Sequence, residues 1–190
     1  MHVALIADYC APVYVGGAEY SVEHLVGWLG QRLDVTVVTP NYGAGQGQGN
    51  VRRYPVPFRR VPVPYALLAN PAWYLYSAWQ VARQSKDADV LHCQGKHHLV
   101  GAWLAARWLR LPCVATLRDY QPLCRYGLTF DDARAQWPRT PAGLYYRLDG
   151  AFKRWVLRHY DQVIVLSEAM RRIYAQHGVE AQVIHNTVAP

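Results

Sequence analysis

Residues 3–19 read VALIADYCAPVYVGGAE, and this stretch decides the fold. The apolar run 3–7 is typical of a strand that is buried on both faces of a parallel sheet. Gly16 and Gly17 then open a segment in which apolar residues recur at helical spacing. The members of that repeat are Val22, Leu25, Val26 and Leu29. A buried strand, a glycine turn and a helix form the first part of a β-α-β unit.

The same alternation continues to the end of the chain. Further strands are expected at 34–39, 89–93, 113–117, 162–166 and 181–184, and helices at 70–85, 99–109, 150–159 and 167–177. Pro40 is expected to end the second strand, and residues 52–64, which carry four prolines, are expected to form an irregular edge strand. The pattern predicts an α/β fold with a doubly wound, mostly parallel, Rossmann-like sheet whose ligands bind at the carboxyl ends of its strands.

Size and composition favour a single domain over residues 1–190, because 52% hydrophobic residues are enough for one substantial core. No apolar stretch approaches the about 18 to 20 residues that cross a bilayer, and no signal peptide is visible. The four cysteines lack a C-x-x-C pair, and Cys93 and Cys113 lie in apolar runs, so we expect a cytoplasmic protein without disulfides. The net charge of +7 favours a phosphate-bearing substrate, an anionic membrane or nucleic acid, and no recognisable nucleic-acid-binding module appears.

The glycine turn is the first candidate binding element. Gly16 and Gly17 allow the backbone to approach a ligand closely, and the following helix directs N–H groups toward an anion or a sugar hydroxyl. The alternative is that the two glycines only make a tight strand-to-helix connection.

Residues 92–98, HCQGKHH, form a polar cluster at the end of a predicted strand. An imidazole or ammonium there can act on an acceptor hydroxyl or phosphate, and Lys96 and His97 are the candidates. A metal site would need three or four converging ligands and would have to include Cys93, which is expected to point into the core, so no metal is predicted. Exposed or capping histidines remain the alternative.

Residues 116–124, TLRDYQPLC, place Arg118 and Asp119 directly after another predicted strand. A guanidinium there can bind phosphate or carboxylate, and a carboxylate can accept a hydroxyl proton. The alternative is an Arg–Asp pair that only holds the loop.

An aromatic segment at 65–79 is flanked by Arg59, Arg60 and Arg83. Such a surface suits a membrane interface, but aromatic residues at helical spacing are more often core. We therefore expect one helix face to be buried, made of Ala72, Leu75, Tyr76, Trp79 and Ala82. The basic residues of the last third are expected on solvated helix faces, namely Arg147, Lys153, Arg154, Arg158, Arg171 and Arg172.

Taken in order, these motifs resemble the N-terminal domain of the family-4 (group 1) retaining glycosyltransferases of the GT-B type. The resemblance covers essentially the whole chain. Its carriers are 16–19 (GGAE), 34–39 (DVTVVT), 89–92 (DVLH), 116–120 (TLRDY), 165–170 (VLSEAM) and 183–188 (VIHNTV).

The resemblance implies transfer of a sugar from a nucleotide-sugar donor to a lipid, sugar or small-molecule acceptor, with no metal cofactor. It places Gly16 and Gly17 near the donor phosphate and sugar, and Glu19, Lys96, His97 and Tyr120 at the acceptor. The family often has histidine where this chain has Arg118, so Asp119 becomes the main catalytic candidate, with Arg118 supplying positive charge.

The family also has a C-terminal donor-binding domain, which would follow Pro190 in the same chain or come from a separate one. The isolated half is therefore expected to be a poor catalyst. The alternative function is a noncatalytic α/β ligand-binding or peripheral membrane interaction module that uses the same crevice.

Overall fold

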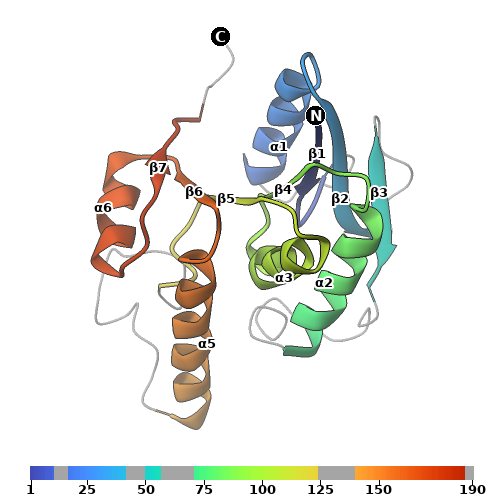
Figure 1. Ribbon diagram of the computed structural model, residues 1–190. Helices are drawn as coiled ribbons and strands as arrows, with labels where there is room; N and C mark the ends of the chain where they lie inside the picture. Colours follow the sequence, from blue (N-terminus) through green and yellow to red (C-terminus); the bar gives the residue numbers. More distant parts are fainter. Residues whose placement is uncertain (11–16, 42–49, 57–70, 124–139, 187–190) are drawn as a thin grey trace. The chain divides into compact units, whose positions relative to one another are not determined.

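Parallel β-structure dominates the computed structural model, which describes residues 1–10, 17–41, 50–56, 71–123 and 140–186 (Figure 1). Its strands follow the order β3-β2-β1-β4-β5-β6-β7. The chain divides into two compact units, Met1–Val114 and Ala115–Pro190, which are described one at a time. The predicted doubly wound α/β fold is confirmed.

The first unit is built around β1 (His2–Ile6), which pairs in parallel with β2 (Asp34–Asn41) on one side and β4 (Val90–Cys93) on the other. In this register, Leu5 lies opposite Val37 of β2 and His92 of β4. The outer strand β3 (Val51–Pro55) pairs in parallel with β2. This strand confirms the predicted edge strand over its first residues, while 57–64 lie outside the described residues.

Pro40 does not end β2, contrary to prediction, because its missing N–H costs the sheet no hydrogen bond. Val37 donates its N–H to Asn50 on the β3 side, at 2.9 Å, and the Val38 carbonyl accepts from Ala7 on the β1 side, at 3.0 Å. Peptide groups alternate along a strand, so Pro40 also faces the β1 side. There β1 has already ended at Ile6, and β2 continues to Asn41 against β3 alone.

Helices cover both faces of the sheet in the first unit. Helix α1 (Gly17–Leu29) packs Val22 and its partly buried neighbours on one face, against a cluster that includes Leu5 and Val37. Helices α2 (Pro71–Gln84) and α3 (Leu99–Leu109) pack against each other on the opposite face (Figure 1). The short 3-10 helix η1 (Lys96–His98) links β4 to α3. This arrangement is what right-handed crossovers produce.

The buried face of α2 is the opposite of the one predicted. Leu75 and Trp79, expected in the core, are 58% and 48% exposed, and Ala72 is exposed as well. The buried residues are Trp73, Tyr74, Ser77, Ala78, Gln80 and Val81. Both faces of this helix are rich in apolar residues, so periodicity alone could not select one. On the buried face, the small side chain of Ser77 lies against Gly101, which lets α2 approach α3 closely.

The second unit continues from β5 (Cys113–Leu117) with α5 (Pro141–Leu157), β6 (Gln162–Val165), α6 (Glu168–Gln176) and β7 (Gln182–Val183). The last two strands pair in parallel. Helix α5 begins at Pro141, earlier than the predicted Gly150. Thr140 is the N-cap of this helix: its hydroxyl accepts the Gly143 N–H at 3.1 Å, and proline occupies the first turn. Ser167 caps α6 in the same way through Met170.

None of the helices in the described part of the chain is long and apolar enough to pass through a membrane.

The contact between α2 and α3 generates a stability prediction. A Cβ at position 101 would lie 3.0 Å from the Ser77 Cβ and 3.1 Å from the Ala78 backbone nitrogen. Gly101→Ala should therefore lower the free energy of unfolding by about 1 to 3 kcal/mol, as overpacking does. The matched control is Gly27→Ala in α1, where a Cβ meets nothing within 4 Å and helix propensity should add about 0.5 to 1 kcal/mol. Urea unfolding measures the free energy of unfolding of both variants, which should fall for Gly101→Ala and rise for Gly27→Ala. A change in the same direction for both would contradict the packing argument.

Candidate functional site

Polar side chains gather where the strands of the first unit end. Asp8 follows β1, α1 begins at Gly17, and residues 94–98 follow β4. Because these strands run parallel, their carboxyl ends lie at one edge of the sheet, where doubly wound proteins place their ligands.

A buried hydrogen-bonded chain lies at the centre of this edge. The Asp8 carboxylate is 2.7 Å from Nδ1 of His98, and it accepts the His97 backbone N–H at 3.2 and 3.3 Å. On the other side of the ring, Nε2 of His98 contacts the Tyr54 hydroxyl. The side chains of His98 and Asp8 are 0% and 11% exposed, and Tyr54 is fully buried. The chain thus joins the end of β1 to η1 and to β3.

The pKa of Asp8 reflects two opposing influences. Burial acts to raise it, because a low-dielectric surrounding disfavours the charged form. The positive potential of His97, the hydrogen bond and charge of His98 and the His97 N–H together outweigh burial and lower the pKa from 3.8 to about 2. Asp8 is therefore a carboxylate at neutral pH.

Gly95 permits the close approach of the loop after β4 to Asp8. A Cβ at this position would lie 2.9 Å from both Cγ and the backbone nitrogen of Asp8. Those distances are too short for any side chain, so glycine is required here for space.

The structure places the predicted residues of this edge at different depths. Gly17 begins α1 with open space around it, whereas Gly16 lies outside the described residues. Glu19 is buried in the first turn of α1, at 7% exposure. Lys96 is exposed, whereas His97 is half-buried and its ring nitrogen Nδ1 is buried.

Two expectations about residues 92–98 have clear outcomes. Cys93 is buried, as predicted, and its thiol donates to the Gly95 carbonyl at 3.3 Å. His98 is neither exposed nor a surface cap; it is part of the core. The His92 and Gln94 side chains contact each other at 2.9 Å. Among the described residues, no group of three or more histidine, cysteine, aspartate or glutamate side chains is placed to hold a metal ion.

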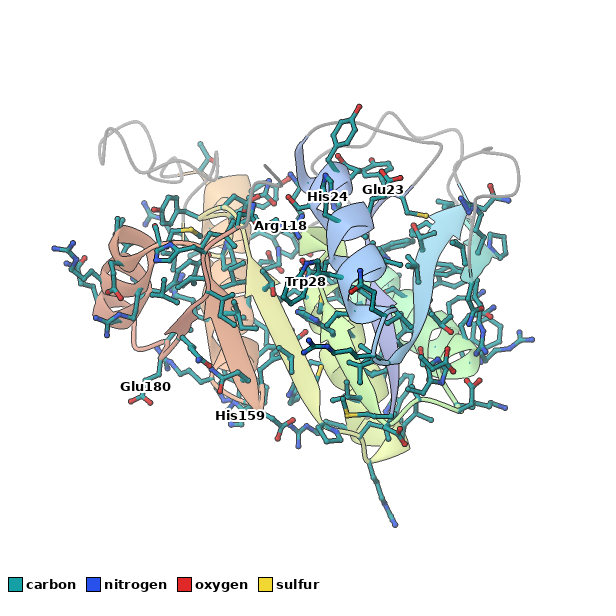
Figure 2. All side chains as sticks on the ribbon, turned by 90° about the horizontal axis from the view of Figure 1, so that it is seen from above. Glu23, His24, Trp28, Arg118, His159 and Glu180 are labelled. Carbon is teal, nitrogen blue, oxygen red and sulfur yellow. The ribbon has the colours of Figure 1, made fainter. Side chains whose placement is uncertain are left out.

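In the second unit, Arg118, Asp119 and Tyr120 follow β5 directly (Figure 2). Their loop is held by its own contacts, since Asp119 accepts the Gln121 N–H at 3.0 Å and its carbonyl accepts the Tyr174 hydroxyl at 2.7 Å. Tyr120 also stacks on Tyr174, with ring centroids 6.1 Å apart. All three predicted residues are half-buried, which leaves part of each side chain accessible.

Lys153 is the residue of this unit that sequence reasoning missed. It is not on a solvated face: its side chain is 7% exposed, and its ammonium lies 2.7 Å from the carboxylate of Asp149, itself 10% exposed. Burial lowers the pKa of Lys153, while Asp149 and, through space, Asp119 act to raise it. The signal in the sequence is an Asp–Lys pair four residues apart within an apolar helix.

Two further basic residues, one in α5 and one at its C-terminal cap, also hold neighbouring backbone. Arg154 donates to the Pro122 carbonyl at 3.0 Å, which secures the end of the Asp119 loop. Arg158 donates to the carbonyls of His177 and Gly178, at 2.7 and 2.9 Å. Arg171 and Arg172 are exposed on α6, as predicted.

A parallel, doubly wound sheet followed at its strand ends by such polar loops defines the class of α/β domains that bind ligands at the carboxyl edge. Residues 16–187 match the family described as the glycosyl transferase 4-like domain. The chain belongs to this family, which confirms the resemblance to a family-4 glycosyltransferase domain; that it is the N-terminal one stays a prediction.

Solved structures of HepE from Anabaena have a similar fold. The complex of HepE with UDP-glucose aligns at a TM-score of 0.64 with 17% identity, over 99% of this chain and 44% of HepE. The complex with UDP and glucose gives 0.63 and 16%, over 98% of this chain and 44% of HepE. This chain thus spans less than half the length of the relative. A search of curated sequences finds no match.

The lowered pKa of Asp8 predicts how stability changes in acid. The unfolded chain binds the proton more readily, so stability is present above pH 4 and is lost as the pH falls from about 4 to 2. The loss should be about 2 kcal/mol, and Asp8→Asn should be less stable than wild type at pH 6 but similar near pH 2. Urea unfolding at both pH values measures this. Glu180→Gln, at an exposed carboxylate, is the control (Figure 2), and an equal deficit of Asp8→Asn at both pH values would contradict the prediction.

The burial of Lys153 predicts an asymmetric response to substitution. Lys153→Met leaves the Asp149 carboxylate without its ammonium and should lower the free energy of unfolding by about 3 kcal/mol. Adding Asp149→Leu should restore most of that loss, since a buried ion pair can be replaced by apolar side chains. Lys86→Met, at an exposed lysine, should change stability by less than about 0.5 kcal/mol. A small loss for Lys153→Met in denaturant unfolding would show that this pair is effectively solvated.

Proposed function

We propose that this chain is the N-terminal, acceptor-side half of a retaining glycosyltransferase that moves a sugar from a nucleotide-sugar donor to a lipid, sugar or small-molecule acceptor. The observation that carries the proposal is the family match over residues 16–187. The fold shared with HepE, a protein solved with UDP-glucose, and the 44% of HepE that the chain covers support the assignment to one half of a larger enzyme.

The donor phosphates and sugar approach the start of α1 in this proposal. Gly17 leaves room for a ligand, since a Cβ there would meet nothing within 4 Å, and Gly16 is proposed to act with it. The first N–H groups of α1 and its positive end suit a diphosphate. Glu19, buried in the first turn, is proposed to accept hydrogen bonds from sugar or acceptor hydroxyls.

Lys96 and His97 are the proposed acceptor-binding residues of the first unit, and Tyr120 is the one proposed for the second. Asp119 serves as the group that orients or deprotonates the acceptor hydroxyl, because its loop is held by Tyr174 and Arg154. Arg118 and the buried ammonium of Lys153 add positive charge around that carboxylate. Fixed charges of this kind stabilise a departing nucleotide diphosphate without a metal ion.

The rest of the catalytic machinery is proposed to lie in a C-terminal donor-binding domain, in the same chain or a separate one. The isolated half is then inactive or nearly so. We place the enzyme in the cytoplasm, with a peripheral contact at the inner membrane face. The net charge of +7 and the exposed Leu75 and Trp79 of α2 support that contact. They are also what favours the second candidate, a noncatalytic peripheral binding module.

Transfer assays separate the two functions. The chain, combined with the donor-binding half encoded after it or beside it, is incubated with UDP-, GDP- and ADP-sugars and a panel of n-octyl glycosides. We expect a glycosylated product, and Asp119→Asn should lower kcat by about 10² to 10⁴, as loss of a general base does. Asp161→Asn, at an exposed aspartate of the same unit, is the matched control and should stay within about twofold. Absence of product with every pair, or full activity of Asp119→Asn, would count against the proposal.

A further inference from the structure

The chain of Asp8, His98 and Tyr54 has no part in the proposed chemistry, although it places a carboxylate and an imidazole in the core. Neither His98 nor Tyr54 is exposed, so neither can touch a substrate. Burying an ion or a polar ring costs free energy unless partners compensate it. A role other than contact with a substrate is therefore needed to explain these buried polar side chains.

We propose that Asp8 is a positioning residue: through His98 and the His97 backbone it fixes η1 (Lys96–His98), and so orients the Lys96 and His97 side chains toward the acceptor. The part that concerns the acceptor rests on the proposed function. The part that concerns the fixing of η1 does not.

Asp8 does for η1 what an N-cap side chain does for an ordinary helix. The residue before η1 is Gly95, which has no side chain, and no cap hydrogen bond is made there. The carboxylate of Asp8, which is 89 residues distant in sequence from His97, accepts the His97 N–H instead. Gly95 is needed at the cap position because the Asp8 carboxyl group lies where its side chain would be.

The peptide groups of His97 are held from two directions. Its N–H bonds Asp8 at the end of β1, and its carbonyl accepts the indole N–H of Trp73 in α2 at 2.9 Å. With both groups fixed, the His97 backbone has little freedom, while Lys96 is exposed and the half-buried His97 ring is accessible in part. The turn is thus tied to the two elements on either side of it.

His98 adds a directional constraint. Because a carboxylate can only accept, Nδ1 of His98 carries a proton and donates it to Asp8. Nε2 then faces the Tyr54 hydroxyl. A ring bonded at both nitrogens cannot flip, and the T-shaped contact of its face with Trp73, at 5.6 Å between centroids, fills the remaining space.

Nuclear magnetic resonance on the 190-residue chain tests the fixing of η1. In wild type the His98 ring should be protonated at Nδ1. In Asp8→Asn, which keeps the shape, the proton should move to Nε2, and the His97 amide should exchange with solvent about tenfold faster, as expected from losing a charge-assisted hydrogen bond. The Leu91 amide, bonded to the Pro112 carbonyl, should exchange as in wild type. Unchanged His97 exchange would overturn the proposal.

Tyr54→Phe provides a second route if Asp8→Asn does not fold. It removes the hydroxyl from His98, and it should speed His97 exchange several-fold by loosening the ring. Tyr76→Phe is the matched control: the lost hydroxyl donates to the Pro55 carbonyl rather than to His98, and the ring that packs against Tyr54 and Trp73 is kept. Equal exchange rates in the two tyrosine variants would overturn the role of the chain.

The transfer assay tests the consequence for the acceptor. With the n-octyl glycoside that wild type uses best, Asp8→Asn should raise the acceptor KM about tenfold, equivalent to one lost charge-assisted contact. The donor KM should stay within about twofold. If wild type is active and the acceptor KM of Asp8→Asn is unchanged, the positioning role of Asp8 is overturned. No transfer by wild type would overturn the proposed function instead, and the exchange rates would still decide whether Asp8 fixes η1.

Discussion

Strand β1 is hydrogen-bonded along both edges and buried on both faces. The rest of the first unit supplies the hydrogen-bond partners and the apolar contacts that this strand needs. Its residues from Val3 to Ile6 are nearly inaccessible to solvent, so every peptide group needs a partner strand and every side chain needs a covering helix. β2 and β4 supply the partners, in parallel, which forces helical crossovers. The handedness of those crossovers puts α1 on one face and α2 and α3 on the other. The chain leaves β1 at Asp8, at the edge where the polar groups collect.

The elements that the sequence predicted correctly are those whose signal is local. Short apolar runs located the strands, and glycine or capping residues located several helix starts. Two of the errors arose where the deciding partner is distant in sequence or position. Pro40 looked like the end of β2, but its compatibility depends on where β1 ends. The buried face of α2 depends on Ser77 meeting Gly101, which no periodicity in α2 reveals.

The candidate site divides in the same way. Arg118, Asp119 and Tyr120 were identified because they directly follow an apolar strand. The Thr140–Pro141 start of α5 was overlooked although its signal is local, and Lys153 was assigned to solvent because a lysine is rarely buried. Asp8 and His98 were harder still, since their bond spans 90 residues; Asp8 lies in no motif, and the histidines of 92–98 were expected to act at the surface or as caps. Buried charges of this sort become visible only once the topology has brought their partners together.

The two buried charged pairs answer different needs of the loops beside them. Asp8 is an anion whose surroundings donate hydrogen bonds, so it can hold the backbone of a turn that lacks a cap of its own. Lys153 is a cation whose carboxylate partner Asp149 lies one helical turn away, and its charge also interacts with Asp119, in a loop that Tyr174 and Arg154 hold. A carboxylate can accept hydrogen bonds from several N–H groups of a distant turn. The positive charge of an ammonium also acts on nearby carboxylates through space. Each kind of charge therefore lies where its hydrogen-bonding capacity suits the loop that it supports.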